Sequence, residues 1–148
     1  MLYDLTAQAV EITRGSNTRL LVNDRADIAL AAGADGVHLT SRSLPPVVVR
    51  NICGPEFLIG VSTRSLAEVR AAQAAGADFV VFGPIFDTES KRVFGEPQGL
   101  DKLREVTMEL GDFPVLAIGG ITNENIAACV SAGASGIAGI SLFERFGQ

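Results

Sequence analysis

The sequence predicts an α/β protein in which parallel strands alternate with helices. Three segments are near copies of one another, and each joins a helical pattern to an apolar run: residues 32–37 (Ala-Gly-Ala-Asp-Gly-Val), 75–80 (Ala-Gly-Ala-Asp-Phe-Val) and 132–137 (Ala-Gly-Ala-Ser-Gly-Ile). The glycine of each copy suits a left-handed helix C-cap, and a strand starts two residues later. Residues 114–118 form an apolar run without alternation, which is typical of a parallel strand covered on both faces. Strands that recur about every twenty residues between helices indicate right-handed β/α crossovers.

The individual elements follow from apolar spacing and from glycine and proline breaks. Leu2, Leu5, Ala9 and Ile12 fall on one face of a first helix, which Gly15 stops. Strands are predicted at residues 18–23, 35–39, 57–62, 78–82, 114–118 and 135–140. Helices are predicted at residues 2–14, from Asn23 or Asp24 to Gly33, from Pro45-Pro46 to Gly54, at residues 65–75 and 100–110, and after a cap at Thr122 or Asn123. These elements form one repeating series, a single domain over residues 1–148.

Two architectures satisfy this series, a doubly wound open sheet and a (β/α)8 barrel. The regular period and the polar residues at the carboxyl end of every strand favour the barrel. Six predicted strands fall short of eight, and 148 residues fall short of the roughly 200 or more that a barrel usually needs. The predicted fold is therefore a TIM-type barrel with an incomplete set of strands.

Composition and charge argue against several classes of function. The chain has a net charge of −5 and no block of basic residues, which disfavours a nucleic-acid groove and an anionic membrane surface. No apolar run reaches the length of a membrane span, and the N-terminus lacks the pattern of a signal peptide. Cys53 and Cys129 have no metal-binding or redox spacing, so free thiols and a cytoplasmic location are predicted.

Two segments that follow apolar strands have the chemistry to hold phosphate. Gly119-Gly120 form a turn without side chains, whose backbone N–H groups suit an anion; a tight turn without a ligand explains the pair equally well. Thr88, Ser90 and Lys91 lie in a long loop, where two hydroxyls and an ammonium can surround a phosphoryl group. A solvated polar loop is the alternative for that second segment.

His38 is the only histidine of the chain. On a strand its side chain faces opposite to those of Val37 and Leu39. A packed, hydrogen-bonded interior histidine is favoured over a catalytic one.

Five motifs, in their order and spacing, closely resemble the thiamine-phosphate synthase/TenI family. They are Leu-Val-Asn-Asp-Arg-Ala-Asp (21–27), Gly-Val-His-Leu (36–39), Gly-Val-Ser-Thr (60–63), Phe-Gly-Pro-Ile-Phe-Asp-Thr-Glu-Ser-Lys (82–91) and Ala-Ile-Gly-Gly-Ile-Thr (117–122). The resemblance runs from about Leu2 to Phe143. It implies a (β/α)8 barrel in which this chain begins at the second helix, so that the first two strands, the first helix and the family's diphosphate-binding Gln-x-Arg-x-Lys segment are absent.

The resemblance assigns the diphosphate and metal side of the site. Thr88, Ser90 and Lys91 match the family's diphosphate-binding Thr-x-Thr-Lys, with serine in place of the second threonine. Lys91 is the expected catalytic residue, because its ammonium stabilises the departing diphosphate. Asn23 and Asp24 match a pair that contacts the pyrimidine diphosphate and magnesium, while a plain helix N-cap stays open for Asp24.

The remaining site residues are also matched by resemblance. Ser62 matches a hydroxyl that lies near the pyrimidine, and it is the second expected catalytic residue. Gly119, Gly120, Ile140 and Ser141 match the site for the thiazole phosphate. Turns after the last two strands supply such phosphate cups in barrels of this type.

Two positions depart from the family's pattern. Ser43 stands where the family has a second magnesium carboxylate, and a neutral hydroxyl is the weaker ligand; Arg42 adds positive charge nearby. Arg64 stands where the TenI branch has its catalytic histidine, and an arginine that stays protonated is a poor general base.

Three functions follow from these matches and departures. The favoured one is a magnesium-dependent transferase of thiamine biosynthesis that joins an aminopyrimidine diphosphate to thiazole phosphate with loss of diphosphate. The alternatives are a TenI-like thiazole tautomerase and a phosphate-binding barrel without turnover. Small phosphorylated substrates are the expected partners, and open sheet edges predict self-association. Because several charge-assisted contacts are missing, this chain is predicted to be a slow synthase.

Overall fold

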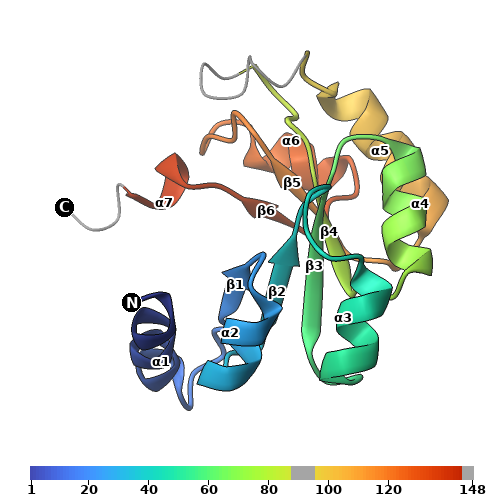
Figure 1. Cartoon of the computed structure of the whole chain (residues 1–148). Coiled ribbons are helices and arrows are strands. Elements are labelled where there is room, and N and C mark those ends of the chain that lie inside the picture. Colours follow the sequence, from blue (N-terminus) through green and yellow to red (C-terminus); the bar gives the residue numbers. More distant parts are fainter. Residues whose placement is uncertain (88–95, 145–148) are drawn as a thin grey trace. The chain divides into compact units, whose positions relative to one another are not determined.

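The computed structural model describes residues 1–87 and 96–144, and the chain falls into two compact units. The first comprises Met1–Val61 with Ala74–Asp78, and the second Ser62–Gln73 with Phe79–Gln148. Over the described ranges, helices and strands alternate as α1 (Leu2–Thr13), β1 (Leu21–Asn23), α2 (Ala26–Ala32), β2 (Gly36–Leu39), α3 (Pro46–Cys53), β3 (Leu58–Thr63), α4 (Leu66–Ala74), β4 (Phe79–Phe82), α5 (Gly99–Leu110), β5 (Val115–Ile118), α6 (Ile126–Ser131), β6 (Gly136–Ala138) and α7 (Ser141–Glu144) (Figure 1). The predicted α/β class with six strands is confirmed.

In the first unit, β1 and β3 flank β2, and both pairings are parallel. Gly36 lies opposite Leu21 on one side and Leu58 on the other. A Cβ at Gly36 would lie 2.1 Å from the Leu58 carbonyl oxygen, so the missing side chain lets β2 and β3 pair at this point. The core of this unit is made of small and branched apolar side chains: Val22, Ala26, Ala29, Ala34, Val37, Leu39, Val49, Phe57 and Ile59.

Helix α1 packs through a different face from the one its apolar spacing indicates. Leu2, Leu5 and Ile12 are 44%, 59% and 83% exposed. Thr6 is buried instead, and its hydroxyl donates to the Leu2 carbonyl oxygen at 2.9 Å. Val10, on the same side of the helix, packs against the core of the first unit. A threonine whose hydroxyl is satisfied within its own helix can be buried at little cost, so its polarity does not decide the face.

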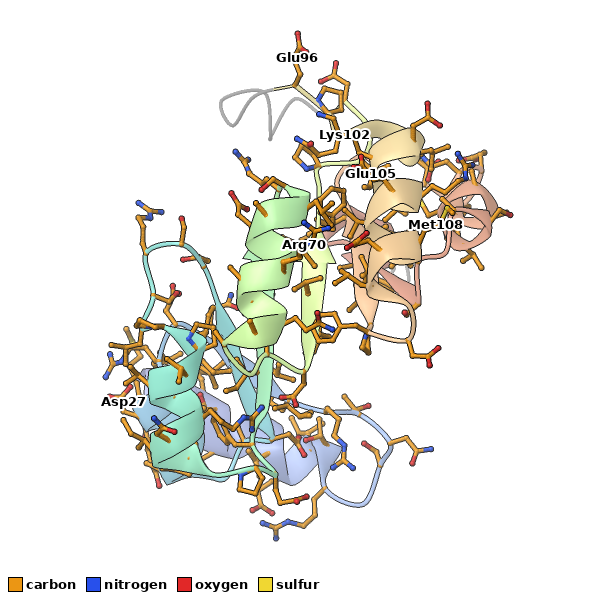
Figure 2. The ribbon with its side chains drawn as sticks, turned by 90° about the vertical axis from the view of Figure 1, so that its right-hand side faces the viewer. Asp27, Arg70, Glu96, Lys102, Glu105 and Met108 are labelled. Carbon is orange, nitrogen blue, oxygen red and sulfur yellow. The ribbon has the colours of Figure 1, made fainter. Side chains whose placement is uncertain are left out.

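In the second unit, β5 pairs in parallel with β4 and with β6. The buried side chains of this unit come from both strands and helices, and include Val69, Val80, Phe82, Leu103, Val106, Val115 and Cys129. Both cysteines are free thiols, but only Cys129 is buried as predicted, and burial raises its pKa; Cys53 is half-buried. Arg70 of α4 forms an ion pair with Glu109 of α5, and Figure 2 shows Arg70 between these two helices.

The three sequence repeats have a common structural role. Gly33, Gly76 and Gly133 all have positive φ angles, of 75°, 91° and 93°. In each copy, the residue two positions later makes two bonds to the backbone of another strand segment. The backbone N–H groups of Asp35, Asp78 and Ser135 donate to the carbonyl oxygens of Leu20, Ile59 and Val115. Their side-chain oxygens accept from the N–H groups of those same three residues at 2.7, 2.7 and 3.3 Å.

These two hydrogen bonds explain why the fourth residue of each repeat is Asp or Ser. A carboxylate or hydroxyl oxygen satisfies a backbone N–H at the strand entry, where a ladder bond is missing. These bonds also explain why β1 begins at Leu21 and not at residue 18, because the Leu20 N–H is bonded to the Asp35 side chain.

Candidate functional site

Asp24 directly follows β1 and has an unusual backbone conformation. Among the non-glycine residues of ranges 1–87 and 96–144, Asp24 alone has a positive φ, of 61°. Its N–H donates to the His38 carbonyl oxygen at 2.9 Å, which extends the β1–β2 pairing by one bond. Aspartate tolerates the left-handed region better than most residues, and such conformations concentrate at functional sites.

The prediction that Asn23 or Asp24 caps the next helix is wrong. Helix α2 begins at Ala26 with Arg25 in the cap position, and no side chain caps it. The Arg25 guanidinium pairs with Asp27 in the first turn, and this hydrogen bond lowers the pKa of Asp27 to about 2. The Asp24 carboxylate therefore has no structural task in its own helix.

The Asp24 carboxylate instead joins the loop after β2. The Ser43 hydroxyl donates to Asp24 Oδ1 across 19 residues of sequence. Ser43 Oγ in turn accepts from the Thr40 N–H at 2.7 Å and lies 3.1 Å from Thr40 Oγ1. The structure thus brings together Asp24 and Ser43, the two positions that the sequence singles out for a metal.

The side chains around Asp24 can supply only part of the ligands that magnesium needs. In the part of the chain that the structure describes, no three His, Cys, Asp or Glu side chains gather into a group able to hold a metal ion. Asp24 offers one carboxylate, and it is exposed. Magnesium is commonly bound by one or two carboxylates together with substrate phosphates, so these residues fit an ion whose other ligands come from a substrate and water.

The second candidate element is the turn after β5. Gly119 and Gly120 have φ angles of 95° and 65°. A Cβ at Gly119 would lie 2.5 Å from Pro84 Cβ, and one at Gly120 would lie 2.7 Å from Phe86 Cβ. Both glycines are therefore required by conformation and by space. This requirement explains the turn with or without a ligand.

The chain after β4 lies directly against this turn. The N–H groups of Ile85 and Phe86 donate to the carbonyl oxygens of Ile118 and Gly119 at 2.8 and 3.0 Å. A Cβ at Gly120 would lie 2.9 Å from the Asp87 carbonyl oxygen. Asp87 immediately precedes Thr88, so the chain enters the predicted diphosphate segment beside the predicted thiazole phosphate turn.

Asn125 holds the turn in place, a role that the sequence pattern did not suggest. Its side-chain Nδ2 donates to the Gly120 carbonyl oxygen at 2.8 Å, and its Oδ1 accepts from the Thr122 N–H at 2.9 Å. The prediction that Thr122 or Asn123 caps the helix is wrong, because α6 begins at Ile126 with Asn125 in the cap position. A Thr-x-x-Asn spacing after the glycines is the signal for such a side-chain-closed turn.

The other predicted residues are distributed as follows. Ser62 lies near the end of β3 and is exposed, and the next residue, Thr63, is buried. Ile140 is 78% exposed just before α7, and Ser141 is the first residue of that helix. Thr88, Ser90 and Lys91 lie outside the described residues, as does the side chain of Ser141.

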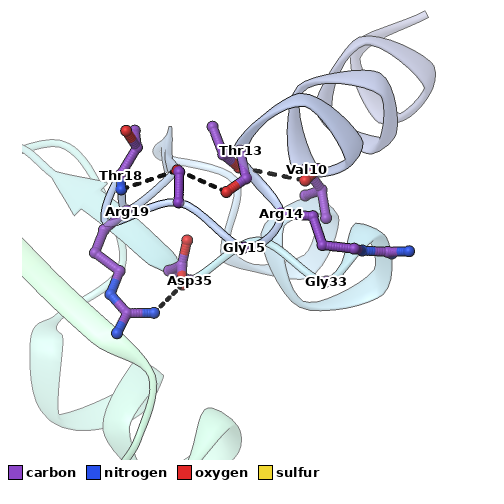
Figure 3. A pocket seen from close by; sticks show the side chains of 9 residues that line it. Val10, Thr13, Arg14, Gly15, Thr18, Arg19, Gly33 and Asp35 are labelled. Carbon is purple, nitrogen blue, oxygen red and sulfur yellow. Dashed lines mark hydrogen bonds and ion pairs between the residues drawn. The ribbon is translucent and has the colours of Figure 1, made fainter.

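The described residues also form pockets whose linings include neither Asp24 nor the glycine turn. One of about 270 Å³ is lined by Val10, Thr13, Arg14, Gly15, Ser16, Thr18, Arg19, Gly33 and Asp35. Figure 3 shows the Arg19–Asp35 ion pair beside it, just before the amino ends of β1 and β2. Another, of about 190 Å³, is lined by Arg64, Lys102 and Glu105 among others, the last two labelled on α5 in Figure 2. Arg64 thus lines a pocket together with side chains of α5.

His38 is half-buried, and its titration predicts a pH dependence of stability. Burial lowers its pKa, and the nearby Asp24 charge opposes this shift. The unfolded chain therefore binds a proton more readily than the folded one, so stability falls as the pH drops below about 6.5. One proton limits the slope to about 1.4 kcal/mol per pH unit.

Urea unfolding between pH 7.5 and 5 should show this decline in wild type and not in His38→Gln. The carboxylates with lowered pKa values, Asp27 and Asp35, act in a separate window below about pH 4. An equal decline in the variant would contradict the assignment to His38, the only histidine.

The fold and these two elements define a β/α protein with an acidic residue and a glycine turn at strand ends, where barrel enzymes hold phosphorylated ligands. The chain belongs to the thiamine monophosphate synthase (TMP-TENI) family, whose model matches residues 1–143. It is 48% identical over 140 residues to a putative thiamine-phosphate synthase of Geobacter sulfurreducens, with 95% of this chain and 65% of that protein covered. It is 49% identical over 134 residues to the thiamine-phosphate synthase of Chlorobium phaeovibrioides, with 90% of this chain and 64% of that protein covered.

A solved structure shows the same fold. The thiamine phosphate pyrophosphorylase from Pyrococcus furiosus superposes with a TM-score of 0.84 at 36% identity, over 95% of this chain and 66% of that one. The chain thus spans about two thirds of the length of these relatives.

Among the described residues, every helix is too short or too polar to span a membrane.

Proposed function

We propose that this chain carries the transferase chemistry of thiamine-phosphate synthesis. One observation carries the proposal: the chain that leads into Thr88, Ser90 and Lys91 packs on the Gly119-Gly120 turn, within one unit. A diphosphate held by the first segment and a phosphate held by the second would then belong to two neighbouring substrates. Family membership and the names of the relatives support the same reaction.

The reaction joins two small phosphorylated substrates. The carbon–oxygen bond between the aminopyrimidine methylene and diphosphate breaks, and its electron pair leaves with the diphosphate. The thiazole nitrogen then donates its lone pair to the resulting pyrimidine cation and forms the new carbon–nitrogen bond. Hydrogen-bond donors and cations placed where charge develops on the leaving group lower this barrier.

The residues of this chain divide the work. Lys91, Thr88 and Ser90 bind the departing diphosphate, and Asn23 contacts the pyrimidine diphosphate. Ser62 offers a hydroxyl to the pyrimidine. Magnesium, when bound at Asp24, supplies positive charge against the diphosphate.

The thiazole phosphate lies at a separate group of residues. Backbone N–H groups of the Gly119-Gly120 turn, with Ile140 and Ser141, bind it. A cytoplasmic location suits both the free thiols and a biosynthetic role.

A turnover assay tests this proposal. Thiamine phosphate formation is measured with both substrates and magnesium, for the wild-type chain, for Asp24→Asn and for the matched variant Asp27→Asn. We expect a slow but measurable rate that Asp24→Asn lowers by about tenfold or more, since a charge-assisted contact to the metal is worth ~1.5–3 kcal/mol. Asp27 is exposed and paired with Arg25, so its variant should stay within about twofold of wild type.

The alternatives give different results in the same samples. Conversion of the thiazole substrate to its tautomer, without diphosphate and without magnesium, would identify a tautomerase. Binding of thiazole phosphate without any product would identify a phosphate-binding barrel. Equal losses in Asp24→Asn and Asp27→Asn would remove Asp24 from the site.

A further inference from the structure

We infer that Ser43 is not a metal ligand but a positioning residue, and that the Asp24 site takes magnesium only together with a diphosphate. This inference rests on the proposed function, because the diphosphate is the leaving group of that reaction. It concerns how the cation arrives, which neither the family match nor the names of the relatives specify.

The hydrogen bonds of Ser43 exhaust its hydroxyl. A serine hydroxyl has one proton and two lone pairs, and an ionised carboxylate only accepts. The single proton of Ser43 goes to Asp24 Oδ1. Thr40 Oγ1, 3.1 Å away, must therefore be the donor in its contact with Ser43, and the Thr40 N–H at 2.7 Å occupies the other lone pair.

A cation on Ser43 Oγ would have to displace one of these bonds. The Arg42 N–H also donates to Thr40 Oγ1 at 3.3 Å, which holds the Thr40 hydroxyl in place. Hydrogen bonds within residues 40–43 thus hold this loop in one conformation, in which the Ser43 hydroxyl donates to Asp24 Oδ1. Ser43 fixes the orientation of Asp24, whose left-handed backbone already restricts it.

One carboxylate gives little affinity for a strongly hydrated dication. Magnesium gives up its water reluctantly and is usually held by one or two carboxylates plus substrate phosphates. In the described part of the chain, Asp24 belongs to no group of three His, Cys, Asp or Glu side chains that could hold a metal ion. The oxygens of a diphosphate are the anionic ligands that the proposed reaction brings, so cation and diphosphate should bind together.

Titration calorimetry with inorganic pyrophosphate tests this without turnover. Wild type is titrated with magnesium alone, with pyrophosphate in EDTA, and with pyrophosphate in excess magnesium. We expect no binding of magnesium alone below about millimolar concentration, and pyrophosphate binding at least about tenfold tighter with magnesium than with EDTA.

Three variants of Ser43 test what its hydroxyl contributes and what a second carboxylate would add. Ser43→Asp places two carboxylates within contact distance, and a cation relieves their repulsion, so magnesium alone should bind about tenfold or more tighter than to wild type. Ser43→Ala should reduce the magnesium-dependent gain in pyrophosphate affinity by about tenfold, since Asp24 loses a charge-assisted hydrogen bond. Ser43→Thr keeps the hydroxyl and should retain the gain.

Three results would each overturn this inference: tight binding of magnesium alone to wild type, an unchanged gain in Ser43→Ala, or no gain from magnesium at all. Circular dichroism of every variant excludes loss of folding as the cause. The turnover assay with Asp24→Asn decides the proposed function separately, because a synthase that binds its ions in another order would still make product.

Discussion

Replacing Gly120 with aspartate should abolish binding of thiazole phosphate to this chain, a loss of about a thousandfold or more. Three effects act in the same direction. The new Cβ would lie 2.7 Å from Phe86 Cβ and 2.9 Å from the Asp87 carbonyl oxygen, so the turn must shift. The φ of 65° disfavours any side chain. The added carboxylate repels the phosphate dianion at the place where backbone N–H groups would hold it.

Gly111→Asp is the matched control for this variant. Gly111 lies in the same unit, at the end of α5, with a φ of 57°, and a Cβ added there would meet nothing within 4 Å. Gly111→Asp therefore adds the same charge, also at a residue with positive φ, without the collision. Titration calorimetry with thiazole phosphate should show binding in wild type and in Gly111→Asp, and none in Gly120→Asp.

Gly119→Ala tests whether the loss of binding in Gly120→Asp comes only from the added charge. It adds no charge, but its Cβ would lie 2.5 Å from Pro84 Cβ, so it should weaken binding while the circular dichroism spectrum stays native. Thiazole phosphate binding that survives both Gly120→Asp and Gly119→Ala would move the phosphate site away from this turn.

Replacing Arg50 with alanine should lower the free energy of unfolding by about 3 kcal/mol, far more than removing a surface arginine. Its guanidinium donates to the carbonyl oxygens of Gly54, Pro55, Phe57 and Gly76 at 2.6–3.3 Å, and forms an ion pair with Asp78 at 2.7 Å. The Arg50 side chain is only 21% exposed. Truncation leaves these carbonyls and a partly buried carboxylate without their donor, which costs more than the pair itself contributes.

Two further variants show whether the guanidinium fork is responsible. Arg14→Ala, in the same unit, removes a surface ion pair with Glu11 whose partners are 68% and 63% exposed, and should cost no more than about 1 kcal/mol. Arg50→Lys keeps the charge but loses the planar fork, and should fall between the two. Urea unfolding followed by circular dichroism measures all three. A loss below about 1 kcal/mol for Arg50→Ala would show that water replaces its contacts.

Local signals in the sequence are enough to set the order of elements. The three Ala-Gly-Ala-Asp/Ser copies place left-handed glycines at 33, 76 and 133, and the Asp or Ser of each copy bonds to another strand segment. A C-cap, an apolar run and a turn each need only neighbouring residues. For the same reason the diglycine turn is readable, since a positive φ at consecutive positions demands residues without Cβ.

Long-range packing determines which partner each polar side chain takes. Asp24 could cap its own helix or bond to a residue far along the chain, and the neighbouring sequence does not decide between the two. The left-handed backbone at Asp24 and the loop that carries Ser43 settle it. Arg50 likewise reads as an ordinary helical arginine, because its partners Gly76 and Asp78 lie 26 and 28 residues away.

The buried face of α1 is the other feature that depends on packing. Apolar spacing indicates Leu2, Leu5 and Ile12, yet the helix buries Thr6 and packs Val10 on the core. Helix periodicity fixes which residues share a face, but the partner surface decides which face is covered. A hydroxyl satisfied within its own helix adds no penalty to that choice, so composition alone does not reveal it.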